Sequence, residues 1–195
     1  MTTPLSQETI NEFVVASHFD LPKVKELLAH HPDLLNENAE WIETPVQAAA
    51  HVNNREIVEY LLEQGAPLDI CTAAVLGRQD DVRAMLADDP DLKDAHGSHN
   101  LNVLFYAALG DSVPVAEALL EAGAQVNAES SQAPLIGAVL GGSPAMVRWL
   151  LDRDADPYAT DFNGRTALEV AEDEHQEEIA ALLRPFYVDE DERER

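Results

Sequence analysis

Cysteine, lysine and long apolar runs are all scarce in this sequence. Cys71 is the one cysteine, so an intrachain disulfide is excluded, as is usual in a reducing compartment. No stretch approaches the roughly 18 apolar residues of a membrane span. The first residues, MTTPLSQETINEF, lack the basic segment and apolar segment of a secretory signal. We therefore expect a cytoplasmic protein without a membrane anchor.

Basic residues are also few. The 12 lysines and arginines stand against 37 aspartates and glutamates, which gives a formal net charge of -25. Such a chain repels nucleic-acid phosphates and anionic membranes and attracts basic partners. The same charge keeps a protein soluble and monomeric, or suits it to a salty cytoplasm, without any partner. We expect a monomer that binds neither nucleic acid nor membrane directly.

One acidic segment imitates a calcium loop without completing it. Asp152, Asp154 and Asp156 follow the D-x-D-x-D spacing, but Pro157 stands where the loop needs glycine. Asn163 then stands where a bidentate glutamate is needed. The segment is better interpreted as the end of a helix followed by a turn.

The other residues that could take part in metal binding or catalysis lack the neighbours that such a site needs. His96 and His99 could bind a metal from a turn with Asp94, but zinc usually needs three or four ligands and no cysteine pair or further histidine lies nearby in sequence. The glycine-rich loop 140–144 lacks a P-loop lysine and a preceding strand, and Cys71 has no evident activating neighbour. Three further histidines fall at predicted inter-helix turns: His18, His51 and His175. We predict no catalytic residue, metal or cofactor, and hence no enzyme.

The segment 146–171 contains the clearest structural pattern. An apolar helical stripe with Leu150 at its centre ends at acidic residues, and Asp161 opens the turn D-F-N-G, whose last two residues tolerate positive φ. Thr166 and Glu169 then fit a capping box that starts a new helix. The segment predicts a helix, a tight turn and a second helix.

This pattern recurs along the chain. Residues 44–50, TPVQAAA, again combine a capping box with a proline at the first helical position, and Gly65 fits a left-handed helix end further on. The small residues that mark successive units are Val15, Ala49, Ala73, Ala107, Ala138 and Ala171. Their spacings are 34, 24, 34, 31 and 33 residues. The short interval falls where the third unit lacks the turn and the T-P start.

The motif D-x-x-G-x-T-x-L-x-x-A after a leucine-rich helix resembles the ankyrin repeat, whose period is about 33 residues. The segment TPVQAAA is similar to the family signature T-P-L-H-x-A-A. The resemblance implies an all-α solenoid of about six helix-turn-helix repeats with short hairpin turns, the first and third degenerate. It divides the chain into an N-terminal tail (1–9), a repeat domain (10–184) and a C-terminal cap extension with an acidic tail (185–195).

The resemblance also implies a function, which is noncatalytic binding of a partner protein in the concave groove formed by turn tips and inner helices. The positions carried over are Glu40, Trp41, Glu43, His51, Val52, Ser98, His99, Leu101, Leu109, Glu129, Ser130, Gln132, Leu140, Phe162, Asn163, Arg165, Asp173 and Glu174. For Trp41, packing and exposure to a partner are equally supported; for Phe162, packing is favoured. A basic segment is the expected partner. The alternative is an acidic nucleic-acid mimic or inhibitor that occupies a basic site on its target, although the carboxylates are spread along the whole chain.

Overall fold

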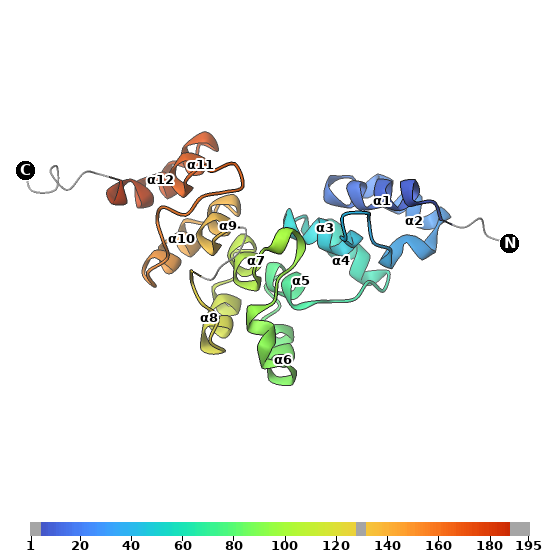
Figure 1. Ribbon diagram of the computed structural model, residues 1–195, viewed down its shortest axis with the longest axis horizontal. Helices are drawn as coiled ribbons and strands as arrows, with labels where there is room; N and C mark the ends of the chain where they lie inside the picture. Colours follow the sequence, from blue (N-terminus) through green and yellow to red (C-terminus); the bar gives the residue numbers. More distant parts are fainter. Residues whose placement is uncertain (1–4, 128–131, 188–195) are drawn as a thin grey trace, which may run out of the picture.

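The computed structural model describes residues 5–127 and 132–187. Within them the chain forms twelve α-helices and four short 3-10 helices, arranged as six successive helix pairs (Figure 1). The α-helices are α1 (Gln7–Phe19), α2 (Leu21–His30), α3 (Pro45–His51), α4 (Arg55–Glu63), α5 (Ile70–Val75), α6 (Gln79–Asp88), α7 (Val103–Leu109), α8 (Val113–Glu121), α9 (Pro134–Leu140), α10 (Pro144–Leu151), α11 (Ala167–Asp173) and α12 (Glu177–Leu183). The 3-10 helices are η1 (Pro32–Asn36), η2 (Pro90–Asp94), η3 (Ser98–Asn100) and η4 (Arg184–Phe186). The predicted all-α solenoid of about six repeats is confirmed.

The odd-numbered helices form an inner layer and the even-numbered helices an outer layer (Figure 1). Each inner helix packs against the inner helix of the next repeat, from α1 and α3 through to α9 and α11. The marker alanines of the last five repeats are completely buried in this layer. The marker chosen for the first repeat is wrong, because Val15 is 57% exposed whereas Ala16 is buried. Ala16 lies 33 residues before Ala49, which is one period of the array.

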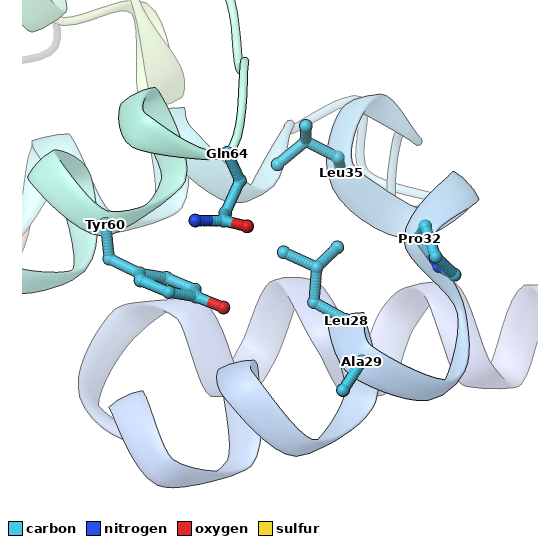
Figure 2. Close-up of a pocket in the computed structure, with 6 residues that line it drawn as sticks. All are labelled: Leu28, Ala29, Pro32, Leu35, Tyr60 and Gln64. Atoms are coloured by element: carbon cyan, nitrogen blue, oxygen red, sulfur yellow. The ribbon is translucent and has the colours of Figure 1, made fainter.

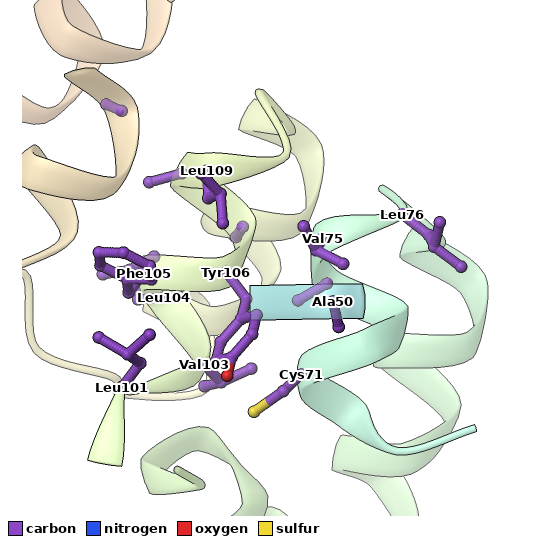
Figure 3. Close-up of a cluster of buried hydrophobic side chains, with 14 of the residues drawn as sticks. Ala50, Cys71, Val75, Leu76, Leu101, Val103, Leu104, Phe105, Tyr106 and Leu109 are labelled. Carbon is purple, nitrogen blue, oxygen red and sulfur yellow. The ribbon is translucent and has the colours of Figure 1, made fainter. Parts of the chain in front are cut away.

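Small residues let the inner helices approach closely. A Cβ added to Gly110 would lie 2.1 Å from the carbonyl oxygen of Val75, and one added to Gly137 would lie 2.7 Å from that of Phe105. Larger side chains fill the space between layers, and Figure 3 shows such a cluster from α5 and α7. Cys71 is buried in it, and burial raises the pKa of its thiol, which agrees with the predicted structural role.

Helix starts and turns follow the predicted residues closely. Both capping boxes form, one at Thr44 before α3 and one at Thr166 before α11. Gly65 and Gly164 take the positive φ values of 101° and 77°. The prediction for Asn163 is wrong, because it does not enter the left-handed region. Its backbone N–H instead donates to the Asp161 carboxylate over 2.8 Å, which holds the turn without that conformation.

The third repeat is complete as a helix pair but lacks its hairpin, as predicted. Helix α4 ends at Glu63 and α5 begins at Ile70, with only a short connection between them. Longer hairpins precede α7 and α11, where isolated β-bridges form between His96 and Asn102 and between Thr160 and Thr166. Because the third hairpin is missing, η3 of the fourth repeat contacts α3 of the second directly.

The two ends of the described chain also carry ordered structure. Helix α1 begins at Gln7, within the segment assigned to the N-terminal tail. After α12, the Tyr187 hydroxyl donates to the carbonyl oxygen of Pro157 over 2.6 Å, and its ring lies 5.0 Å from that of Tyr158. The C-terminal extension therefore folds back against the hairpin before α11. None of the helices in residues 5–127 and 132–187 is both long and apolar enough to cross a membrane.

Candidate functional site

The residues assigned to the groove divide into an exposed and a buried set. Glu40, Trp41, His99, Leu140, Phe162, Asn163, Asp173 and Glu174 are exposed. Glu43, Leu101, Leu109 and Gln132 are buried, while His51, Val52, Ser98 and Arg165 are partly buried. Glu129 and Ser130 lie outside the described residues. Direct exposure to a partner was therefore wrongly expected for the four buried side chains, which pack beneath the hairpins and between inner helices.

Aromatic and imidazole rings form a continuous row across the inner layer, which we call the ring row. It consists of Phe19, His18, His51, His99 and Phe162, and the successive ring centroids lie 5.7, 5.0, 4.7 and 6.2 Å apart. Phe19 and Phe162 at its ends are 78% and 57% exposed, so the expectation that Phe162 mainly packs is wrong. The missing third hairpin lets His51 and His99 meet.

A further hairpin, residues 39–43, precedes α3 and is closed by a hydrogen bond from the Ala39 backbone N–H to the Glu43 carbonyl oxygen over 3.0 Å. It adds two exposed apolar side chains next to the ring row. Trp41 is 46% exposed and Ile42 is 85% exposed. Ile42 also has a φ of 61°, a left-handed conformation that a β-branched residue rarely adopts and that costs about 1–3 kcal/mol. A strained and exposed isoleucine at a turn tip indicates a functional surface rather than optimal folding.

Glu43 lies directly beneath this tip and is 2% exposed. Its Oε2 accepts a hydrogen bond from Trp41 Nε1 over 2.8 Å. Its Oε1 lies 2.9 Å from His51 Nδ1 but outside hydrogen-bond geometry, so this buried oxygen has no aligned donor. Burial raises the pKa of Glu43, but contacts from His51, Trp41 and Ser98 outweigh burial and lower the pKa from 4.5 to about 2. Glu43 is thus a buried, ionised carboxylate.

Two histidines from neighbouring repeats flank this carboxylate. His18 Nδ1 lies 3.0 Å from the carbonyl oxygen of Val14, and its Nε2 lies 3.6 Å from Glu43 Oε2. The backbone at His18 is held by Asn54, whose Nδ2 donates to the His18 carbonyl over 3.0 Å. Among the residues that the structure describes, His18, Glu43 and His51 form the one group whose ligand atoms could share a metal ion.

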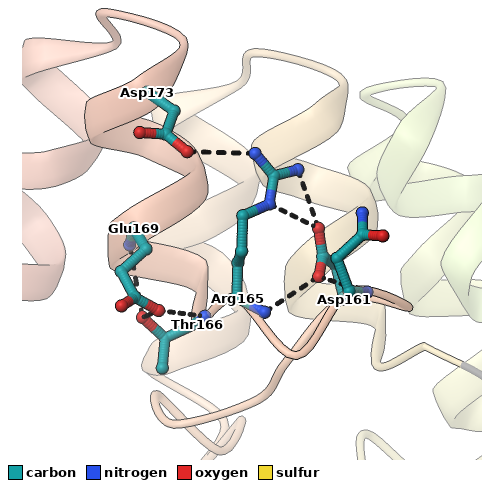
Figure 4. A network of polar contacts seen from close by, with 6 residues as sticks. Asp161, Arg165, Thr166, Glu169 and Asp173 are labelled. Atoms are coloured by element: carbon teal, nitrogen blue, oxygen red, sulfur yellow. Dashed lines mark hydrogen bonds and ion pairs between the residues drawn. The ribbon is translucent and has the colours of Figure 1, made fainter.

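The hairpin before α11 buries a carboxylate in a different manner. The side chain of Asp161 is 6% exposed and accepts hydrogen bonds from the backbone N–H groups of Asn163 and Arg165. Arg165 also donates to it through Nε and Nη2, over 2.9 and 2.8 Å, and its Nη1 reaches Asp173 (Figure 4). The guanidinium of Arg165 therefore stabilises the hairpin, and we assign this predicted groove residue a mainly structural role.

Sequence spacing did not identify His18, Phe19 and Ile42 as site residues. One usable signal was present, because His18 and His51 both lie at the ends of inner helices and are 33 residues apart. Equivalent positions one period apart stack in a solenoid. No comparable signal marks Ile42, since its exposure follows from the turn that the backbone adopts.

A small pocket lies away from the ring row, between α2, η1 and α4 (Figure 2). Its lining residues are Leu28, Ala29, Pro32, Leu35, Tyr60 and Gln64. Its lining has no charged side chain, and Tyr60 is its one titratable group.

Comparison with known sequences decides the family. A family model for three copies of the ankyrin repeat matches residues 13–130, and a model for many copies matches residues 119–171. The chain belongs to the ankyrin repeat family. Ankyrin repeats are generally protein–protein interaction modules and are typically not enzymes.

Two relatives share part of this ankyrin array. Inversin from Gallus gallus is 32% identical over 117 residues, which cover 59% of this chain and 11% of inversin. The NAD-capped RNA hydrolase NUDT12 from Homo sapiens is 39% identical over 67 residues, which cover 34% of this chain and 14% of that protein. The matched regions are thus a small share of each relative, and the similarity concerns the repeats.

Proposed function

We propose that this ankyrin array binds a partner protein along the ring row and the adjoining hairpin tips. The observation that carries the proposal is the ring row, which is exposed at Phe19, His99 and Phe162. The hairpin before α3 adds the exposed side chains of Trp41 and Ile42. Large apolar side chains exposed together on a folded protein commonly mark an interaction site, and aromatic residues dominate binding energy at interfaces. The strained φ of Ile42 supports the same assignment.

The proposed partner is a segment that combines arginine or lysine with apolar residues. The net charge of -25 favours approach of a basic chain. Glu40 beside Trp41 and Asp173 near the other end of the row are exposed carboxylates. Arginine can pair with such carboxylates and stack on aromatic faces at the same time. The array thus offers both contacts that an arginine-containing segment can use.

The proposal can be tested with a displayed library of random peptides. Selection on the wild-type protein is expected to enrich basic peptides that contain apolar residues. The triple variant Phe19→Ala, Ile42→Ala and Phe162→Ala should bind them at least about 100-fold more weakly, since a few central residues carry most of an interface's energy. Phe186→Ala is the matched control, because Phe186 is 37% exposed but lies outside the ring row.

Equal binding by the triple variant and the wild type would show that the ring row is not the binding surface. Circular dichroism and urea unfolding must first show that the variants are folded. Titration with salt addresses the acidic-mimic alternative, because exposed ionic contacts are screened at high ionic strength and apolar contacts are not. Complete loss of binding at high salt, with no effect of the triple variant, would favour the mimic.

A further inference from the structure

We infer that His18, Glu43 and His51 form a binding site for one divalent transition-metal ion with the ligand preferences of zinc. The site shares His18 and His51 with the ring row, but the inference does not depend on partner binding, because it rests on the geometry around the buried Glu43. The three residues come from two repeats and meet where α1 and α3 end beside the hairpin. Two imidazoles and one carboxylate are ligand types that zinc prefers.

The distances fit a single ion. One ligand atom from each of the three residues lies within 4.8 Å of the other two. His51 Nδ1 is 2.9 Å from Glu43 Oε1, and His18 Nε2 is 3.6 Å from the other carboxylate oxygen, Oε2. Zinc–nitrogen and zinc–oxygen bonds of about 2.0–2.2 Å place tetrahedral ligand atoms roughly 3.4 Å apart. Small side-chain rotations therefore bring the three atoms onto one ion.

The buried carboxylate has polar neighbours but no permanently charged partner. The Glu43 side chain is 3% exposed, and no arginine or lysine in the described chain forms an ion pair with it. Its Oε1 has no aligned hydrogen bond, and an unsatisfied buried polar atom is costly. An ion bound between Oε1 and the two imidazoles would give Oε1 an aligned contact and place a permanent positive charge beside the carboxylate.

The surrounding groups also resemble the outer shell of a metal site. Trp41 Nε1 donates to Glu43 Oε2 and fixes the plane of the carboxylate. The Nδ1 of His18 lies against the backbone carbonyl of Val14, which leaves Nε2 as the nitrogen that faces Glu43. Metal-bound histidines commonly donate their second nitrogen to a carbonyl in this way. Glu43 and His18 are thus oriented before any ion arrives, whereas His51 must turn its Nδ1 away from the Gln47 carbonyl oxygen, which lies 3.3 Å away.

The site is accessible to a metal ion from solvent. The side chains of His18 and His51 are 17% and 13% exposed, so an ion can enter from the inner face of the array. Three protein ligands leave a fourth tetrahedral position for water or for a donor atom of a bound partner. Calcium and magnesium are disfavoured, because they require oxygen ligands rather than imidazoles.

Isothermal titration of metal-free protein with zinc chloride tests the site. The wild type should bind one ion per chain, while His18→Ala, His51→Ala and Glu43→Gln should each weaken binding at least about ten-fold. His30→Ala is a matched control, because His30 also lies at a helix end with its Nδ1 2.8 Å from the carbonyl oxygen four residues earlier. Unlike His18 and His51, it is exposed and does not belong to the group around Glu43. It should bind zinc like the wild type.

Nuclear magnetic resonance supplies a second readout that does not depend on the stability of the Glu43 variant. Zinc should shift the imidazole signals of His18 and His51 and leave those of His175, at the other end of the array, unchanged. Equal loss of affinity in the His30 and His51 variants would overturn the inference. So would equal binding of magnesium, or shifts spread over all histidines, since either result indicates adventitious surface binding.

Discussion

Two hairpins of this array each bury a carboxylate, and they satisfy it by different means. Asp161 is surrounded by two backbone N–H groups and a guanidinium that donates twice. Glu43 has one indole donor and two imidazoles, with one oxygen left unaligned. The hydrogen-bonding needs of the first carboxylate are met within the hairpin. The second is the carboxylate at which we propose that zinc binds.

Replacing Asp161 should have the largest effect on folding. Asp161→Ala removes four hydrogen bonds and leaves two backbone donors beneath the hairpin, so we expect a loss of about 3 kcal/mol in the free energy of unfolding. Urea denaturation measures it. The matched control is Asp173→Ala, because Asp173 contacts the same Arg165 but its side chain is 61% exposed. That variant should change stability by less than about 1 kcal/mol, and an equal loss in both would contradict the structural role of Asp161.

Zinc should stabilise the fold through Glu43 and not through Asp161. A ligand that binds only the folded state at 100 times its Kd stabilises it by about 2.7 kcal/mol. We expect this gain in the wild type and in Asp173→Ala, measured as a rise in melting temperature, but not in Glu43→Gln. A comparable gain in the Glu43 variant would place the ion elsewhere on the acidic surface.

The charge of Asp161 also has a distinct pH signature. Burial raises its pKa, but hydrogen bonds from the backbone and side chain of Arg165 outweigh burial and hold the pKa below the ordinary value of 3.8. Because the folded-state pKa is the lower one, the ionised group stabilises the fold above pH 3.8, and this contribution is lost as the pH falls through the folded-state value.

Asp161→Asn therefore gives a pH-dependent difference from the wild type. Asparagine keeps one acceptor oxygen, so we expect a loss of about 2 kcal/mol at pH 7. The difference should shrink below pH 3.8, because the carboxyl group of Asp161 in the unfolded wild type then binds a proton, and it should vanish once the folded-state group is protonated too. Glu43 titrates in both proteins and cancels in the comparison. Urea denaturation at pH 7, 4 and 3 measures the difference, and a constant difference would show that charge is not the source of the stabilisation.

The sequence predicted the scaffold more completely than the site. Repeat period, capping boxes and the missing third hairpin follow from local residue patterns, which fix local backbone structure. Burial of Glu43 and Leu101 could not be predicted, because it depends on how far each hairpin folds over the inner layer. The meeting of His51 with His99, 48 residues later, depends on how closely the second and fourth repeats approach where the third hairpin is missing. Local patterns carry little information about either.

The smallest expected change in stability comes from removing the helix caps that follow both hairpins. Each is followed by a capping box, in which Thr44 or Thr166 accepts from the third backbone N–H of the helix and Gln47 or Glu169 reaches back. Removing such a cap typically costs about 1 kcal/mol, so Thr44→Ala and Thr166→Ala should destabilise the array by similar amounts in urea. Neither change removes a zinc ligand, so zinc affinity should stay within about two-fold of the wild type. If Thr44→Ala abolished zinc binding while the helices persisted, the position of Glu43 would depend on the cap rather than on Trp41 and the two histidines.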